Sequence, residues 1–367
     1  MPYPKLDRTL IQMKPLSARE NKVQIENDHI PLSAQPQHLS PSGQTLIREV
    51  ADRMRTARAN GKPVILASGA HTIKNGLAPI LNHLMEEGWL THLATNGAGV
   101  IHDWEFAFQG ESSEDVKGGV SRGEFGNWQE TGFNINLALN IGAYEGLGYG
   151  ESVGAMIENE GLTIPSVAEL ERDILDNIQS NPDRVASMAD LISIIKQFDL
   201  PAGWMSIPHA WKQYSIQAKA YQLGIPFTGH PMIGHDIIYN HPMNHGGALG
   251  RVALRDFLTF AEAVSRIDGG VYLSLGSAVM SPMIFEKSLS MAQNLALQKG
   301  DVIDTHYILV VDLAKSSWDW TKGEPPEDNP DYYLRFNKSF SRMGGTMRYL
   351  TADNRDFLLG LAHQLES

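Results

Sequence analysis

The stretch PVILASGAHTIKNGLAPILNHLMEEGWLTHLATNGAGVIHD, residues 63 to 103, decides the fold of this chain. It opens with the apolar run Pro63 to Ala67, which is too short for a helix and has the length of a buried strand. From Thr72 to Leu84, apolar residues recur at spacings of three and four, which predicts a helix that ends before Gly88. A second apolar run, residues 90 to 94, then predicts a second strand.

Each predicted strand is followed by small residues, Ser68 to Ala70 after the first and Asn96 to Gly99 after the second. Two parallel strands joined by a helix would place both turns at the carboxyl edge of a sheet, where open α/β sheets bind ligands. Small residues allow backbone N–H groups to approach a phosphate closely, and they equally suit a tight turn without any ligand. His102 and Asp103 lie just beyond the second turn, so we expect them to reach the same crevice.

The rest of the chain repeats this alternation of apolar strands and amphipathic helices about five times, which predicts a doubly wound, mainly parallel α/β sheet. We expect an extended N-terminal arm over residues 1–41 and a single domain over 42–367. The polar, glycine-rich segment 104–134 predicts a long loop, of the kind that is either functional or a surface elaboration. The other expected elements are helices over 42–60, 166–198, 252–264 and 282–296, strands over 271–276 and 307–311, and a strand or connector over 203–209.

The chain has 30 basic and 42 acidic residues, a net charge of −12. This excess of acid argues against a nucleic acid or an anionic membrane surface as the partner and suits a cationic ligand. The chain contains no cysteine, which excludes disulfides, thiolate metal sites and cysteine nucleophiles. No apolar run of 18 residues occurs and the N-terminus lacks a charged-then-apolar segment, so we expect a cytoplasmic location.

Further motifs follow the opening stretch in a fixed order. They are Gly224-Ile225-Pro226 before Gly234-His235-Asp236, the run from Val271 to Gly276, the acidic Gly/Pro loop from Gly323 to Asp328, and the run from Tyr349 to Asp353. Together with the opening stretch they resemble the deoxyhypusine synthase family over roughly residues 60 to 365. The resemblance implies a Rossmann-like fold, NAD as cofactor, a polyamine substrate, an N-terminal extension that packs on a neighbouring subunit, and a homotetramer.

The resemblance also implies roles for individual residues. His102 stands where the family has an acidic residue in the second turn. Asp236 matches a substrate-binding aspartate, and Asp328, with Glu327 before it, stands at or beside a substrate-binding glutamate; carboxylates suit ammonium ligands because the pairing is charge-assisted. The residues implied in cofactor binding are Ala70, His71, Thr72, Lys74, Asn96, Gly97, Ala98, Ser277 and Asp353.

Two departures argue against deoxyhypusine synthesis. Leu334 occupies the position of the family's imine-forming lysine and Pro282 that of its catalytic histidine. Arg335 cannot replace the lysine because a guanidinium stays protonated, and Lys338 is the nearest other amine.

Three functions therefore stay open. One is a divergent enzyme that acts on a small molecule, with NAD and an amine. Another is a metal-dependent hydrolase in which the catalytic pairs His102-Asp103 and His235-Asp236 bind a divalent metal. The last is a non-catalytic small-molecule-binding protein that keeps the fold.

Overall fold

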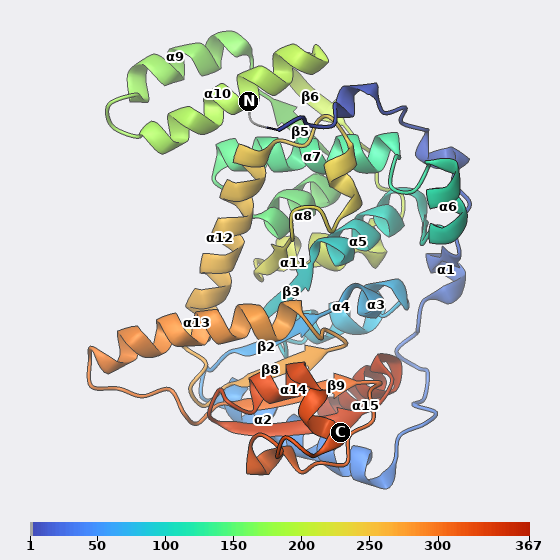
Figure 1. The fold of residues 1–367 in the computed structure, drawn as a ribbon, viewed down its shortest axis with the longest axis vertical. Helices are drawn as coiled ribbons and strands as arrows, with labels where there is room; N and C mark the ends of the chain where they lie inside the picture. The colour runs from blue at the N-terminus through green and yellow to red at the C-terminus, as the bar shows by residue number, and fades with distance from the viewer. Residues whose placement is uncertain (1–2) are drawn as a thin grey trace. The chain divides into compact units, whose positions relative to one another are not determined.

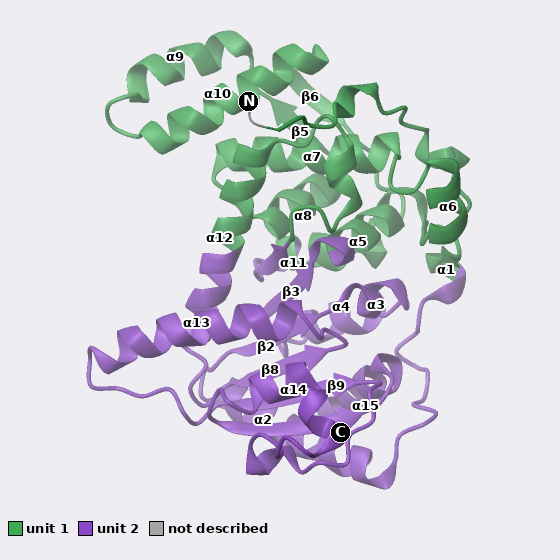
Figure 2. Cartoon of the chain, viewed as in Figure 1, with its two compact units in different colours: residues 1–26, 100–221, 231–256 green, residues 27–99, 222–230, 257–367 purple. Residues whose placement is uncertain are grey.

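The computed structural model describes residues 3–367 and divides into two compact units (Figures 1 and 2). Unit 1 comprises residues 1–26, 100–221 and 231–256, and unit 2 comprises residues 27–99, 222–230 and 257–367. Helices α5 (Gly97–Gln109), α11 (Ile216–Leu223) and α12 (Gly246–Ser265) carry residues of both units. The single domain over 42–367 stays a prediction.

Unit 2 contains a six-stranded sheet whose strands all run parallel, in the order β10-β9-β8-β2-β3-β7. The central pair aligns Val64 of β2 with Val271 of β8 and Ser68 with Leu275. This sheet confirms the predicted doubly wound, parallel α/β architecture. The strands are β2 (Val64–Ser68), β3 (His92–Asn96), β7 (Phe227–His230), β8 (Val271–Leu275), β9 (Tyr307–Asp312) and β10 (Thr346–Thr351).

The chain order of these strands locates the point where ligands bind in such sheets. From β2 the chain moves outward to β3 and β7, and then returns to the other side of β2 for β8, β9 and β10. In dinucleotide-binding folds the same order, 3-2-1-4-5-6, creates a crevice at the carboxyl edge between the two strands where the direction reverses. In this chain those strands are β2 and β8.

Apolar side chains cover both faces of the sheet. Ile65 and Ala67 of β2 join an apolar cluster with Phe285 and Phe340, which lie in α13 (Met280–Leu297) and α14 (Arg335–Phe340). Because successive strand residues point to opposite faces, Leu66 faces the other side. There α2 (Pro41–Ala59) contacts β2, β8 and β10 and packs against α15 (Asn354–Glu366), which also contacts α4 (Ala78–Glu86).

Two local features of the opening stretch differ from the prediction. The expected helix over Thr72 to Leu84 is divided into α3 (Ala70–Lys74) and α4 by Gly76, whose φ is +75°. A side chain there would also collide with the backbone, since a Cβ atom would lie 2.6 Å from the carbonyl oxygen of Asp28. The expected turn at Asn96 is instead the start of α5, because the Asn96 Oδ1 accepts a hydrogen bond from the N–H of Gly99 at 2.9 Å.

Unit 1 is mainly helical, and the six strands of the central sheet all belong to unit 2. The predicted long loop over 104–134 is wrong, because α5 continues to Gln109 and a strand and further helices follow. The expected strand at 203–209 forms β6 in a separate antiparallel pair with β5. The elements of unit 1 are β4 (Glu111–Ser112), α6 (Val116–Arg122), α7 (Gln129–Glu145), α8 (Tyr149–Asn159), β5 (Gly161–Ile164), α9 (Val167–Asn177), α10 (Pro182–Phe198), β6 (Gly203–Ser206), and the 3-10 turns Lys212–Tyr214 and Ile237–Asn240.

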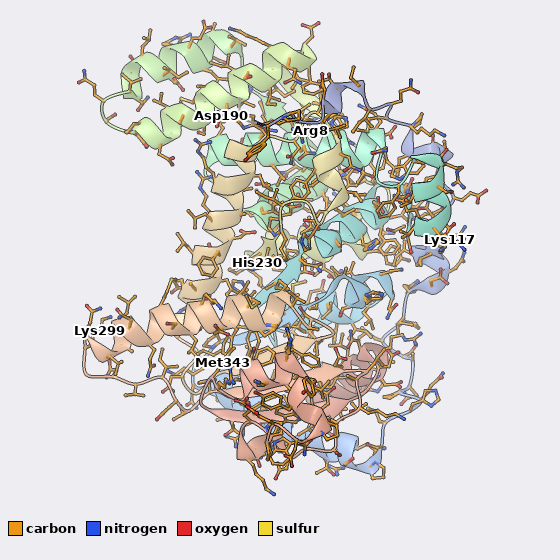
Figure 3. The ribbon with its side chains drawn as sticks, in the orientation of Figure 1. Arg8, Lys117, Asp190, His230, Lys299 and Met343 are labelled. Atoms are coloured by element: carbon orange, nitrogen blue, oxygen red, sulfur yellow. The ribbon has the colours of Figure 1, made fainter. Side chains whose placement is uncertain are left out.

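The first part of the N-terminal arm packs on unit 1 of its own chain. Val23 and Gln24 (β1) pair with β4 in an antiparallel bridge, and the side chain of Leu16 is buried. The guanidinium of Arg8, labelled in Figure 3, donates to the carbonyl oxygens of Tyr239 at 2.7 Å and Asn244 at 3.1 Å. Packing on a neighbouring subunit and the homotetramer stay predictions.

No helix among residues 3–367 is both long enough and apolar enough to cross a membrane.

Candidate functional site

The carboxyl edge of the unit 2 sheet contains a small cavity of about 230 Å³. The ends of four strands contribute to it: β2, β8, β9 and β10. It therefore lies beside the reversal point between β2 and β8, where the strand order locates a binding crevice. Its lining consists of His71, Asn75, Gly276, Asp312, Leu313, Asp353 and Asn354.

Two glycines allow the strand ends to approach one another closely. A Cβ atom at Gly69, directly after β2, would lie only 2.3 Å from the carbonyl oxygen of Gly276, directly after β8. Gly276 has a φ of +54°, in the left-handed region that favours glycine. Across the cavity, the Asn354 side-chain amide donates to the Thr72 hydroxyl at 2.9 Å. These contacts hold the ends of β2, β8 and β10 in one arrangement.

Asp312, the last residue of β9, is a lining residue that sequence reasoning missed. One of its carboxylate oxygens accepts from the N–H of Ala314 at 2.9 Å, and no hydrogen bond of the other oxygen occurs among residues 3–367. A carboxylate oxygen facing a cavity at this edge suits a ribose hydroxyl or an ammonium group. The available signal was its position, since it follows the apolar run from Tyr307 to Val311 directly.

Unlike Asp312, Asp353 uses both of its carboxylate oxygens in hydrogen bonds at the start of the helix that follows it. Both of its carboxylate oxygens accept from Arg355, and one also caps the first turn of α15. The Arg355 side chain, chiefly through these hydrogen bonds, holds the pKa of Asp353 below its usual range. Asp353 therefore carries a negative charge at neutral pH, and the exposed His71 belongs to the same lining.

The structure brings together only some of the predicted cofactor residues. His71 and Asp353 line the cavity, and Thr72 joins it through Asn354. Ser277 adjoins Gly276, and its hydroxyl accepts from the N–H of Ser281 at 3.1 Å near the start of α13. Thr72 and Ser277 adjoin the lining without being part of it, and the other predicted residues outside it are Ala70, Lys74, Asn96, Gly97 and Ala98.

In the first predicted catalytic pair, the side chains of His102 and Asp103 both form hydrogen bonds within unit 1. Asp103 is fully buried, and its carboxylate accepts from the Ser215 hydroxyl and from the backbone N–H groups of Ile216 and Gln217 at 2.6–3.2 Å. It thus caps the start of α11. Burial is the main influence on Asp103 and raises its pKa. His102 lies 2.6 Å from the Ser112 hydroxyl through its Nδ1.

The second pair lies in the segment after β7, also within unit 1. His235 is exposed, whereas Asp236 is half-buried and receives a hydrogen bond of 3.4 Å from the Tyr239 hydroxyl. Among residues 3–367, no group of three or more histidine, aspartate or glutamate side chains is placed to hold a metal ion.

The surroundings of Asp236 favour its protonated form. Burial raises its pKa to about 6. The phenol of Tyr149 is fully buried without a hydrogen-bond partner among the described residues, and burial followed by the charge of Asp236 raises its pKa. A half-buried carboxylate beside tyrosine hydroxyls can exchange its proton for a bound cation.

The loop that resembles the family's lysine region contains no amine poised for imine formation. Leu334 packs against the apolar cluster of unit 2, and Pro282 is buried in the first turn of α13. The ammonium of Lys338 lies 3.0 Å from Glu324 and over the ring of Tyr332. The Tyr332 contact, followed by Glu324, raises the Lys338 pKa, so its amine stays charged. Glu327 and Asp328 are exposed and lie outside the cavity lining.

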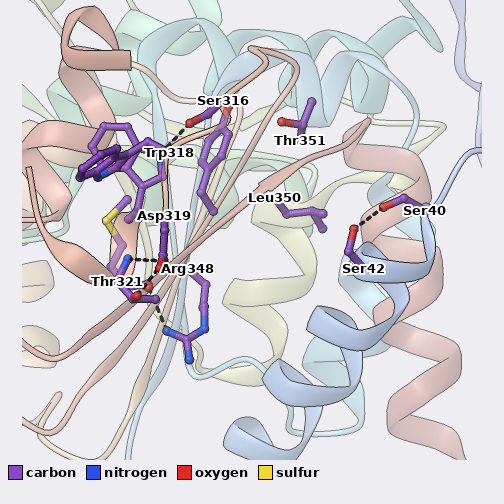
Figure 4. A pocket seen from close by; sticks show the side chains of 12 residues that line it. Ser40, Ser42, Ser316, Trp318, Asp319, Thr321, Arg348, Leu350 and Thr351 are labelled. Atoms are coloured by element: carbon purple, nitrogen blue, oxygen red, sulfur yellow. Dashed lines mark hydrogen bonds between the residues drawn. The ribbon is translucent and has the colours of Figure 1, made fainter. Parts of the chain in front are cut away.

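A second hollow of unit 2 lies against the edge strand β10 (Figure 4). Its polar side chains already bond to one another or to nearby residues. The Thr321 hydroxyl donates to Asp319 at 2.7 Å, the Ser40 and Ser42 hydroxyls lie 3.0 Å apart, and Arg348 pairs with Glu49 at 3.2 Å. This hollow is therefore a weaker candidate than the cavity at the carboxyl edge.

Comparisons with known proteins found no matching protein family and no matching curated protein. Among solved structures, a putative LOR/SDH protein from Methanococcus maripaludis S2 is similar over 92% of this chain and 73% of its own, with 13% identity and a TM-score of 0.46. ArgZ, a cyanobacterial arginine dihydrolase, covers 88% of this chain at 15% identity and a TM-score of 0.41. AgrE in a complex with ornithine and NAD⁺ covers 88% at 14% identity and a TM-score of 0.43. This chain spans 33% of the length of ArgZ and of AgrE.

Proposed function

We propose that this chain binds a dinucleotide of the NAD type at the carboxyl edge of unit 2 and acts on a small ligand that carries an ammonium group. The observation that carries the proposal is the strand order, which reverses between β2 and β8 beside the cavity that Asp312 lines. General rules for open α/β sheets associate this position with dinucleotides. Bound NAD would supply a hydride acceptor.

The residues around the cavity fit part of such a cofactor. A volume of about 230 Å³ is below the range of roughly 300–1,000 Å³ typical of ligand pockets, so the cavity suits one ribose with its attached group. Asp312 would accept from ribose hydroxyls, since one carboxylate oxygen has no other described partner. Asn75 and Asn354 add amide groups to the lining, and Gly276 keeps the backbone open to close approach.

Replacing Asp312 by asparagine should weaken NAD⁺ binding by about 10- to 100-fold, because hydrogen bonds to charged groups contribute roughly 1.5–3 kcal/mol. Isothermal titration calorimetry of the full chain measures this effect. Asp268→Asn is the matched control, since Asp268 bonds to Thr305 and Asp304 and is not part of the cavity lining. Equal NAD⁺ affinities for wild type and Asp312→Asn would remove Asp312 from the site.

Amine binding should depend on the ionisation of Asp236. Its pKa of about 6 means that the carboxylate is mostly protonated at pH 5, and a protonated carboxyl cannot neutralise an ammonium. We therefore expect spermidine affinity to rise by about tenfold between pH 5 and 7 and to level off at higher pH. Calorimetry at several pH values tests this, with Asp236→Asn expected to bind weakly and with little pH dependence. A strong, pH-independent signal from that variant would exclude Asp236.

The wild-type protein should not transfer an aminobutyl group to a protein acceptor. Imine formation needs a neutral amine, whereas Leu334 is apolar and the pKa of Lys338 is raised by Tyr332 and Glu324. Incubation with radiolabelled spermidine, NAD⁺ and a lysine-containing acceptor protein checks this by counting label in the acceptor. Label incorporated by the wild type and lost in Lys338→Met would contradict the expectation and assign the chemistry to Lys338.

A further inference from the structure

A third cavity of unit 2, distinct from the hollow beside β10, lies at the opposite, amino edge of the same sheet. Its volume is about 290 Å³, and its lining includes Val64 and His92, the first residues of β2 and β3. The cavity at the carboxyl edge is lined instead by residues that follow the strand ends. Because all six strands are parallel, the two cavities lie at opposite ends of the sheet and share no residue.

Three cationic side chains line this amino-edge cavity, against a single carboxylate. Arg58, Lys62 and Arg266 contribute to it, and Glu262 is its single carboxylate. Glu262 already pairs with Arg266 at 2.8 Å, which leaves an excess of positive charge. This excess is a local reversal, because the whole chain carries a net charge of −12.

Arg58 is held in a position suited to an anion. Its guanidinium lies over the ring of Trp89, with 4.4 Å between the guanidinium carbon and the ring centroid. A contact of this kind restricts the motion of the guanidinium, a group that binds phosphate or carboxylate through two parallel hydrogen bonds. No carboxylate partner of Arg58 occurs among the residues that the structure describes.

The remaining lining indicates which anion fits. Pro63, Val64, Pro226 and Ala263 give the cavity apolar walls, and the hydroxyl-bearing Thr259 lies among the same residues as Arg266. Apolar walls beside a cationic rim suit a small molecule that combines phosphate groups with an apolar or ring portion. We propose that this cavity binds a phosphate-bearing small molecule, separately from the dinucleotide at the carboxyl edge.

Calorimetric titration of the full chain with pyrophosphate tests the proposal. We expect saturable binding that weakens at least about fivefold in Arg58→Gln and in Arg266→Gln, since each change removes a charge-assisted contact. Arg53→Gln is the matched control, because Arg53 lies on the same helix over the Tyr307 ring and outside the cavity. Absence of saturable pyrophosphate binding, or an equal loss in Arg53→Gln, would overturn the proposal.

Titration of the same variants with ATP, inorganic phosphate and NAD⁺ identifies the ligand and separates the two cavities. Stronger binding of ATP than of inorganic phosphate supports a ring-bearing ligand, and weaker binding of ATP overturns that part. Loss of pyrophosphate binding with NAD⁺ binding retained supports two sites. Parallel loss of both would mean that the anion binds with the cofactor and would overturn the second site. If NAD⁺ does not bind even the wild type, that result contradicts the dinucleotide site proposed at the carboxyl edge and leaves the amino-edge site unaffected.

Discussion

Lowering the pH from 7 to 4.5 should remove about 5 kcal/mol from the unfolding free energy of unit 2 through His92 and His230. Both side chains are buried and each has an Nε2 near the hydroxyl of Thr228, at 3.1 and 2.9 Å. Both rings also meet the edge of Phe260. Burial, aided for His92 by the charges of His230 and Arg266, lowers the pKa of each to about 3.

The direction of this effect follows from proton linkage. The folded state binds fewer protons than the unfolded chain, in which histidine has a pKa near 6.5. The stabilisation is therefore complete above pH 6.5 and is lost as the pH falls toward 3. One pH unit corresponds to about 1.4 kcal/mol per group, so two units below 6.5 give roughly 2–3 kcal/mol for each histidine. Folded domains typically have an unfolding free energy of about 5–15 kcal/mol. A loss of this size should therefore bring unit 2 close to unfolding.

Urea unfolding at pH 7 and pH 4.5 measures the loss, with circular dichroism as the signal. His92→Gln keeps a nitrogen or oxygen near the Thr228 hydroxyl but does not titrate, so its pH-dependent loss should be about half that of the wild type. Substitution of the exposed His235 by glutamine is the matched control. An identical pH dependence in wild type and His92→Gln would show that His92 contributes nothing to acid sensitivity.

Breaking the ion pair between Arg19 and Glu105 should destabilise unit 1 by about 3–5 kcal/mol, the typical cost of leaving one buried charge unpaired. The Arg19 Nη1 and Glu105 Oε1 lie 2.7 Å apart, and both side chains are 2% exposed. Ser112 and Thr131 donate further hydrogen bonds to the same carboxylate. Burial alone would raise the pKa of Glu105, but the charge and hydrogen bond of Arg19, followed by the His102 charge and the Ser112 hydrogen bond, outweigh burial and lower it.

Urea unfolding of Arg19→Met and Glu105→Gln at pH 7 measures this loss. The double variant should recover part of it, because removal of both partners leaves no unpaired buried charge. Lys196→Gln is the matched control, since its pair with Glu171 is exposed and such pairs contribute about 0–1 kcal/mol. A loss below about 1 kcal/mol in both single variants would mean that the arm is not anchored through Arg19.

Strong periodic patterns made part of the fold predictable from the sequence. The runs at β2, β8 and β9 are apolar because the parallel sheet buries them on both faces. Helix α2 is capped by the residue directly before it, since the Ser40 hydroxyl accepts from the N–H of Gly43 at 3.0 Å. Local residues alone decide such elements, and they were placed within a few residues of the observed bounds.

Other elements depended on contacts that are distant in the sequence. The glycines of the segment 104–134 suggested a loop, yet Gly119 lies buried within α6, and Gly132 packs so closely on His241 that a Cβ atom would lie 2.6 Å from its side chain. Asp103 was expected in the crevice because it follows a strand and turn, whereas its carboxylate caps a helix that begins 113 residues later at Ile216. Asp312 was missed because a single acidic residue after a strand has no distinctive pattern.

Hydrogen–deuterium exchange of the full chain with and without saturating NAD⁺ tests most directly whether a dinucleotide binds at the carboxyl edge of unit 2. We predict slower exchange in the peptides that follow β2, β8 and β9, around Gly69 to Gly76, Gly276 to Ser281 and Asp312 to Ala314. Peptides around Gly61 and Pro226, at the amino edge, should exchange as before. Unchanged exchange throughout, or protection confined to segments away from the three strand ends, would contradict the account.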